Sequence, residues 1–173
     1  MSVIIDGTNG VTFPNSTLQY SAGKILQVVQ TVKTNVFSTS TTGSWVDITG
    51  ISATITPFSA TNNILVLFNV VLAPADTGGL RIVRDGNAIG VGDSLGGVTY
   101  QGTSSGVAVV NADKSAPVSG MFIDSPNKNT STTYKVQFWN YTGTSWVNRP
   151  VNGTNATYTG SSISTITLLE IAA

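Results

Sequence analysis

The stretch TYKVQFWNY, residues 133–141, decides the fold class of this chain. Apolar and polar side chains alternate along it, with Tyr134, Val136 and Phe138 on one face and a lysine and a glutamine on the other. A period of two residues is the pattern of a β-strand that turns one face toward a core. β-branched and aromatic residues dominate the other apolar segments too, and no helical stripe extends beyond one turn. The chain is therefore predicted to be all-β.

Further strands follow from the same period and from the turn residues between them. The predicted strands are 24–34, 45–48, 51–56, 64–72, 80–84, 88–91, 107–110, 118–123 and 162–171. Asp85-Gly86-Asn87 is the clearest hairpin turn, and Thr49-Gly50 is expected to be another turn. The 64–72 segment is apolar on both faces, so it should lie centrally and be covered twice. Many short strands with regularly spaced turns indicate an antiparallel β-sandwich of jelly-roll type.

The first 22 residues differ from the rest of the chain. They contain two turn dipeptides, Asp6-Gly7 and Asn9-Gly10, but too few apolar side chains to bury a core. We expect an extended N-terminal β arm over 1–22 that docks on other chains by strand addition, and a head domain over 23–173. The side chains predicted to dock are Val3, Ile4, Ile5, Val11 and Phe13.

The composition excludes several classes of protein. The chain has no Cys and no His, so disulfides, thiol chemistry and Cys/His metal sites are excluded. Eight basic residues balance eight acidic ones without a basic run, which argues against nucleic acid as a partner. The longest apolar run, at 64–72, is about half a membrane span, so no membrane partner is expected. No cofactor or metal is expected either.

Catalytic motifs are weak in this sequence. Gly102-Thr103-Ser104-Ser105-Gly106 matches the G-x-S-x-G pattern, but no helix is predicted after it and the chain has no histidine base. Two loop aspartates could meet as a glycosidase pair, although turn-forming roles explain Asp85 and Asp124 more simply. We therefore predict no catalytic residues and expect that the protein is not an enzyme.

Two predicted strands carry more apolar surface than one sheet face needs. The 24–34 strand has apolar side chains on both faces, and the 133–141 strand has two aromatic residues on its otherwise polar face. The extra side chains are either an edge tucked under a loop or an interface between subunits, and both explanations remain open. The candidates for a trimer interface are Ile25, Val29, Trp139 and Tyr141.

Long loops rich in Asn, Gly, Ser and Thr are the expected recognition elements. Ser and Thr number 44 and Asn 14, so hydroxyl and amide groups rather than charges coat the surface. Aromatic residues in these loops either stack on sugar rings or pack in the core and interfaces. The residues predicted to face a receptor are Tyr100, Trp146, Asn148, Arg149 and Tyr158.

The segment DGTNGVTFP, residues 6–14, resembles the D-G-T-x-G-[IV]-x-F-P motif of phage tail-fibre proteins and small virion proteins. Asn15-Ser16 stands where that motif usually has Asp-Gly. Later segments follow in an order that is also similar to phage structural domains, namely GKILQVVQ at 23–30, RDGNAIG at 84–90 and ITLLEIA at 166–172. The resemblance implies a virion structural protein, often a homotrimer, on the surface of a phage particle.

Two functions agree with this resemblance. The first is a non-enzymatic tail-fibre-type appendage, anchored to other virion proteins by its arm and contacting a host glycan or protein through the head loops. The alternative is a trimeric capsid decoration protein, of cement or head-fibre type, that stabilises or decorates the phage head.

Overall fold

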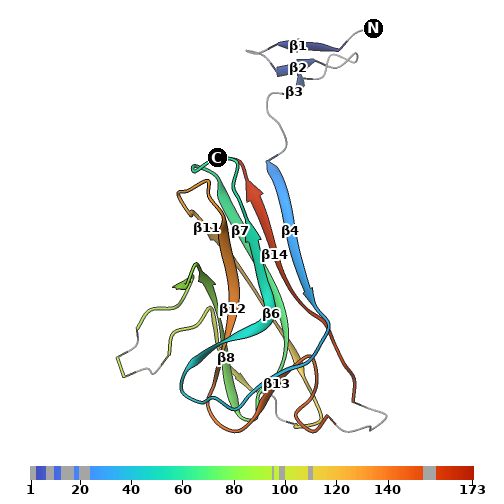
Figure 1. The fold of residues 1–173 in the computed structure, drawn as a ribbon, viewed down its shortest axis with the longest axis vertical. Coiled ribbons are helices and arrows are strands. Elements are labelled where there is room, and N and C mark those ends of the chain that lie inside the picture. The colour runs from blue at the N-terminus through green and yellow to red at the C-terminus, as the bar shows by residue number, and fades with distance from the viewer. Residues whose placement is uncertain are drawn as a thin grey trace.

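The computed structural model describes residues 3–6, 10–12, 18–19, 24–94, 96–97, 100–108, 111–153 and 159–173. Every regular element in these ranges is a β-strand, and neighbouring strands pair antiparallel (Figure 1). Within the same ranges, no helix is long and apolar enough to cross a membrane. The prediction of an all-β chain is confirmed.

Most strands belong to two sheets that pack face to face. Sheet 1 has six strands: β4 (Ile25–Lys33), β14 (Ser164–Ile171), β7 (Asn63–Ala73), β11 (Ala116–Asp124), β13 (Ser145–Val147) and β5 (Phe37–Thr39). Sheet 2 has five strands: β6 (Trp45–Ile55), β12 (Thr132–Asn140), β8 (Thr77–Arg84), β9 (Asn87–Ile89) and β10 (Ser104–Ala108).

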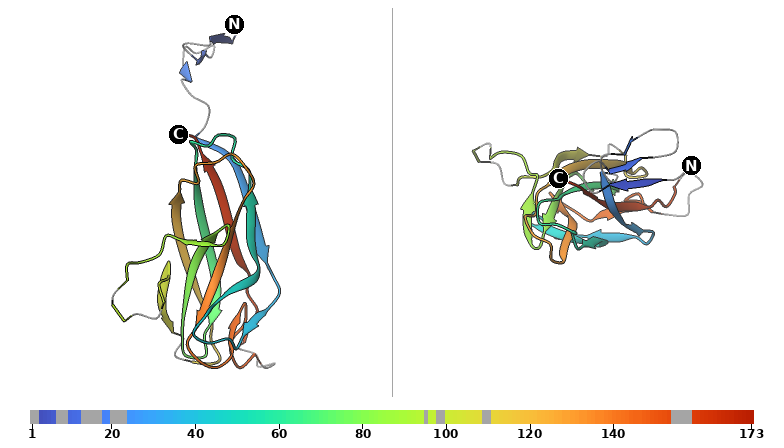
Figure 2. Two further views of the ribbon diagram at one scale, coloured as in Figure 1. Left: turned by 60° about the vertical axis from the view of Figure 1, so that its left-hand side comes forward. Right: turned by 90° about the horizontal axis from the view of Figure 1, so that it is seen from above.

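The order of the strands is that of a jelly roll. The strand order in sheet 1 is β4-β14-β7-β11. The short strand β13 pairs with β7 beyond the stretch that pairs with β14, and β5 pairs with β13 on the side where β4 pairs with β14. Sheet 2 reads β6-β12-β8, with β9 and β10 sharing the far edge of β8. The chain alternates between the sheets, so strands distant in sequence lie side by side (Figures 1 and 2). This is the double Greek key of an eight-stranded jelly roll, as predicted.

The core lies between the two sheets and is built from the alternating pattern of the strands. Tyr134, Val136 and Phe138 are fully buried, as the period of two predicted. They meet apolar side chains of β7 and β14 from the opposite sheet, including Val66 and Leu168. Burial of a large apolar side chain stabilises the fold by about 1.5–3 kcal/mol, so this layer is the main source of stability of the head.

Two strand predictions are wrong in detail. Thr49-Gly50 is not a turn, because β6 runs continuously from Trp45 to Ile55. The extra residues form a bulge opposite β12, and Gly50 adopts a positive φ of 88° there. In addition, Trp146 lies on the short strand β13 rather than in a loop.

The prediction for β7 holds for its central position and, over the last part of the strand, for burial on both faces. β7 is central, with β14 and β13 on one edge and β11 on the other. Ile64 and Val66 are buried, whereas Leu65 and Leu67, which alternate with them, keep part of their surface exposed. Further along the strand, Val71 and Ala73 on this same face are buried, so only the first part of β7 is open on its outer face within the described chain.

The N-terminal strands form a third, small sheet. Its order is β1 (Ile4–Asp6), β2 (Gly10–Thr12) and β3 (Leu18–Gln19). These strands lie beyond the end of the sandwich at which β4 begins and β14 ends (Figures 1 and 2). Val3 is half exposed, and Phe13 lies outside the described residues. Docking by the predicted arm side chains stays a prediction.

Candidate interaction surfaces

The outer face of sheet 1 carries an apolar row that crosses all four of its long strands. Ile123 is the cross-strand neighbour of Leu65, Leu65 of Leu169, and Leu169 of Val28. Four more apolar residues lie in the adjoining rows. We call the whole set the apolar belt: Ile25, Val28, Leu65, Leu67, Met121, Ile123, Leu169 and Ile171.

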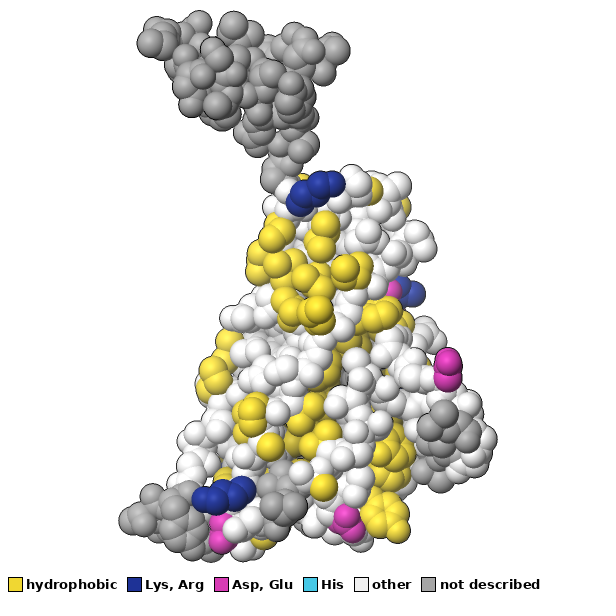
Figure 3. Space-filling view, turned by 180° about the vertical axis from the view of Figure 1, so that it is seen from behind, with side chains coloured by type: hydrophobic (Ala, Val, Ile, Leu, Met, Phe, Trp, Pro, Cys, Tyr) yellow, Lys and Arg dark blue, Asp and Glu magenta, His cyan; other side chains and the backbone are white. Residues whose placement is uncertain are grey.

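The apolar belt is open within the described structure. Val28 is 59% exposed, Ile123 58% and Met121 72%. Hydrophobic side chains gather in the upper part of this face, near the end at which β4 begins (Figure 3). A contiguous apolar area of this kind on a protein surface usually marks a site of interaction.

The apolar belt ends on the two long edge strands of sheet 1, β4 and β11. β4 pairs with β14 and β11 pairs with β7, and no other described strand pairs with the outer edge of either. Exposed edge strands with apolar side chains tend to pair with other chains unless something protects them. The edges and the apolar belt together favour a partner on sheet 1.

A cluster of aromatic residues lies on the outer face of sheet 2. Tyr100 stacks on Trp139 with ring centroids 3.8 Å apart, and Trp45 meets Tyr100 edge to face at 5.9 Å. Gly79 makes room for this stack, because a Cβ atom there would lie 2.9 Å from the Tyr100 ring. Tyr141 flanks Trp139 at 6.2 Å and is 60% exposed. Adjacent aromatic rings of this kind can present a flat surface to a ligand.

A cavity of about 590 Å³ opens beside the aromatic cluster. Its lining residues are Thr42, Gly43, Thr77, Tyr100, Trp139 and Tyr141. The lining combines aromatic rings with a few hydroxyl groups and includes no charged side chain among the described residues. These features are typical of sites for small neutral molecules.

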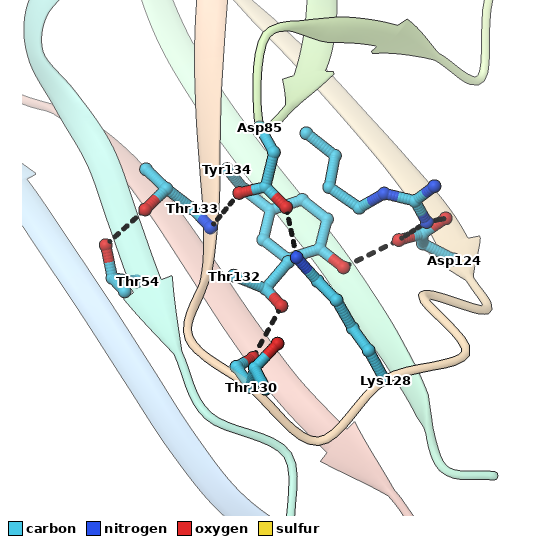
Figure 4. Close-up of polar contacts among 9 residues, drawn as sticks. Thr54, Asp85, Asp124, Lys128, Thr130, Thr132, Thr133 and Tyr134 are labelled. Carbon is cyan, nitrogen blue, oxygen red and sulfur yellow. Dashed lines mark hydrogen bonds and ion pairs between the residues drawn. The ribbon is translucent and has the colours of Figure 1, made fainter. Parts of the chain in front are cut away.

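A polar cluster at the β8–β9 turn holds neighbouring segments of the chain together through hydrogen bonds. The Tyr134 hydroxyl donates to Asp124 at 2.6 Å, and Arg84 donates to both oxygens of Asp124 at 2.8 Å. Asp85 accepts hydrogen bonds from Lys128 and from a backbone N–H of β12 (Figure 4). Since donors from the chain itself occupy both oxygens of Asp124, the cluster fixes the β11–β12 connection against β8.

Burial and charge set the pKa values of this cluster. Burial, and then the hydrogen bond to Asp124, raise the pKa of Tyr134 above its ordinary value. The hydrogen bond from Lys128 and that from the Thr133 backbone lower the pKa of Asp85. Tyr134 therefore stays a neutral donor and Asp85 an anion at neutral pH, in keeping with fixed structural roles.

Acidic residues do not gather elsewhere as metal ligands. Over the described ranges, no three Asp or Glu side chains come close enough together to hold an ion. Glu170 is fully buried and accepts hydrogen bonds from Gln27, Asn62 and the backbone N–H of Phe58 at 2.6–2.8 Å. This carboxylate of β14 thus holds β4 and the β6–β7 connection together at the end of the sandwich where β4 begins.

The predicted interface residues have different environments. Ile25 is 56% exposed and belongs to the apolar belt, whereas Val29 packs against the core from the other face of β4. The prediction that Val29 faces outward with Ile25 is wrong, because a bulge near the start of β4 shifts the alternation. Trp139 is buried under Tyr100, as in the alternative of an edge tucked under a loop, but β12 is a central strand between β6 and β8 and not an edge.

The predicted receptor residues do not form one surface. Tyr100 belongs to the aromatic cluster on sheet 2, whereas Arg149 lies over the ring of Trp146 on sheet 1 at 3.8 Å. Tyr158 lies outside the described residues. The sequence pattern did not indicate the contact of Tyr100 with Trp139, because the predicted strand began at Leu80 and left Gly78-Gly79 outside it, whereas β8 includes both glycines.

Asn148 is fully buried, so the prediction that it faces a receptor is wrong. Its side-chain amide donates to the backbone carbonyls of Lys33 and Asn35, and its oxygen accepts from Ser164. Its own backbone N–H donates to the carbonyl of Val71, where β7 changes partner from β14 to β13. Asn148 thus fills a break in the hydrogen-bonding ladder of sheet 1.

Comparison with known proteins gives little beyond the fold. No family model and no curated protein sequence matches the chain. In structure, the chain is similar to one in the structure of infectious bursal disease virus Gx strain, with a TM-score of 0.38 and 13% sequence identity. The match covers 92% of this chain and 45% of the viral chain, so this chain spans less than half the length of the viral chain. A likeness of this size carries no conclusion about function.

Proposed function

We propose that the protein is a non-enzymatic structural subunit on the surface of a phage virion, of tail-fibre type. Its N-terminal strands anchor it to other virion proteins, and its head assembles with copies of itself through sheet 1. The observation that carries the proposal is the open apolar belt, which crosses sheet 1 at the same end of the head as the N-terminal strands. The resemblance of residues 6–14 to tail-fibre motifs supplies the virion setting and the expectation of a trimer.

The face of sheet 1 is suited to a second copy of the chain. The apolar belt carries no charge, so copies that meet there bury no unpaired ion. Covering the exposed half of Val28 or Ile123 would stabilise the assembly by roughly 1 kcal/mol each. A hollow of about 410 Å³ beside the belt, between β11, β7 and β14, offers space for a partner's side chain.

Light scattering on the purified protein tests the assembly. Three times 17.9 kDa is expected for the full chain. The double variant Val28→Lys/Ile123→Lys should dissociate, because assembly would bury two unpaired ammonium groups per copy. Ser38→Lys, at an exposed position of β5 in the same sheet, is the matched control and should leave the mass unchanged. A monomeric full chain at micromolar concentration would contradict the proposal.

Gold-labelled antibodies on purified virions test the location. Labelling on the tail is the expected result, and it should disappear when residues 1–22 are removed from the protein while the head still folds. Labelling over the capsid would replace the tail-fibre assignment with capsid decoration. Particles that incorporate the shortened protein normally would contradict an anchoring role for the N-terminal strands.

A further inference from the structure

The aromatic cavity on sheet 2 has a feature that packing alone does not explain. Trp139 is only 5% exposed, yet its indole Nε1 has no hydrogen-bond partner in the described structure. It is the one buried side-chain nitrogen or oxygen in the described residues for which this holds. The indole N–H is a donor only, and leaving a buried donor unpaired is unfavourable. The nitrogen is shielded from solvent by the atoms around it, so an incoming ligand cannot reach it directly.

The cavity beside this indole has an open aromatic surface. Tyr141 is 60% exposed at the rim, and the stacked Tyr100 and Trp139 form the adjoining wall. The hydroxyl of Thr77 donates to Asp76, so its oxygen remains available as an acceptor. The cavity volume of about 590 Å³ is within the range of small-molecule sites.

The lining selects the chemistry of the ligand. The described lining has no basic side chain, and Asp76 stands next to it, so an anion would find no partner. A purely apolar ligand would make no hydrogen bond with the threonine hydroxyls of the lining. A sugar ring has apolar C–H faces that lie flat on aromatic rings and hydroxyl groups that donate and accept. It therefore suits both the aromatic rings and the threonine hydroxyls of the lining.

We propose that this cavity binds a neutral pyranose ring of a host surface glycan. The inference deepens the proposed function, on which it rests for the source of the glycan. The cavity is lined by the start of β8, the end of β12 and the connections before β6 and β10, at the opposite end of the head from the N-terminal strands (Figures 1 and 2). A protein anchored by those strands would present the cavity outward, and several copies in one assembly would add their weak affinities.

Indole N–H resonances of the ¹⁵N-labelled full chain test the proposal. The chain has three Trp residues, so three indole signals are expected, each assigned by a Trp→Phe variant. Methyl glycosides of glucose, galactose, mannose and N-acetylglucosamine are the probes. At least one should shift the Trp139 signal saturably, with a dissociation constant on the order of millimolar. Trp146, which lies under Arg149 on sheet 1, is the internal control and should not move.

Two variants separate binding from folding. Tyr141→Ala removes an exposed ring and should weaken binding at least about tenfold while the indole signals stay dispersed. Phe58→Ala removes another exposed aromatic ring, in the connection between β6 and β7, and should bind as the parent does. A multivalent glycan carrying the same sugar should bind the assembled protein more tightly than the free glycoside does.

The proposal is overturned if none of the four glycosides shifts Trp139 saturably up to about 50 mM. Equal shifts of Trp139 and Trp146, or unchanged binding by Tyr141→Ala, would overturn it as well. The mass measured by light scattering is independent of these results. If the protein is a trimer and no glycoside binds, only the sugar site is rejected. If a glycoside binds and the protein is a monomer, only the assembly is rejected.

Discussion

Replacement of Glu170 by glutamine should destabilise the head and remove part of its pH dependence. The buried carboxylate accepts from Asn62 and the Phe58 backbone at one oxygen and from Gln27 at the other. In Glu170→Gln one oxygen remains, but an amide N–H now faces the Gln27 donor. Gln27 cannot simply turn over, because it also donates to the carbonyl of Thr56 at 2.8 Å.

The magnitude follows from these contacts. One buried donor without an acceptor costs about 1–3 kcal/mol, and hydrogen bonds to a charged group exceed neutral ones by roughly 0.5–1.5 kcal/mol. Relief from burying a charge offsets part of this loss. We expect the free energy of unfolding to fall by about 2–3 kcal/mol at pH 7, a large share of the stability of a single domain.

The pH dependence has a definite sign. Burial raises the pKa of Glu170, but the hydrogen bonds from Asn62, Gln27 and the Phe58 and Ser59 backbones outweigh it, so the net pKa lies below its ordinary 4.5. A lowered pKa in the folded state means that the stabilisation is complete above pH 4.5 and is lost as the pH falls through the folded pKa. The glutamine variant lacks this contribution and should depend less steeply on pH below about 4.5.

Guanidinium unfolding, followed by Trp fluorescence at one protein concentration and at pH 7, 5, 4 and 3, measures both effects. Asp76→Asn removes an exposed carboxylate that accepts from its neighbour Thr77, and serves as the control with little change. Other carboxylates with lowered pKa values, Asp47 and Asp85, are present in both proteins and cancel in the difference. If Glu170→Gln unfolds like the parent at pH 7, or if the two proteins lose stability in parallel on acidification, the reasoning is refuted.

Three further substitutions test the described packing through the same unfolding measurement. Tyr134→Phe should cost about 1–2 kcal/mol, because Asp124 loses a donor at 2.6 Å; an unchanged free energy would show that this contact contributes nothing. Asn148→Ala should cost about 2–4 kcal/mol, since two carbonyls and a hydroxyl lose their partner and alanine is strained at a φ of 67°. Gly120→Ala should cost about 1–3 kcal/mol, because the new Cβ would lie 2.5 Å from the buried ring of Phe68, and a neutral result would mean that this ring moves freely.

Local patterns in the sequence were sufficient to predict the sandwich and most of its long strands, but not the short strands β5 and β13. The alternation around Val136 and the turn at Asp85-Gly86 depend on neighbours in the chain, and both are as predicted. The turn expected at Thr49-Gly50 is a bulge because β6 continues along β12, and a bulge depends on the partner strand. A strand's own sequence does not contain its register against a distant one.

The interaction surfaces were harder to predict for the same reason. Asn148 has the composition of a loop residue, yet its partners are Lys33, Asn35 and Ser164, all distant in sequence. Trp139 has an exposed position in the strand pattern, yet a loop brings Tyr100 over it. Both environments are set by the jelly-roll connections, which bring separate segments to one place.

The two outer faces of the sandwich differ in what it would cost to cover them. Two of the three described ion pairs belong to sheet 2 and the connections beside it, including Lys135 with Asp47 at 2.7 Å on its outer face, and the third joins Arg84 of sheet 2 to Asp124 of sheet 1. Covering that face with another chain would strip water from these charges. The apolar belt on sheet 1 contains no charge, so covering it removes apolar surface from water without that penalty. Assembly through sheet 1 therefore leaves sheet 2 and its aromatic cavity in contact with solvent, where a ligand can reach them.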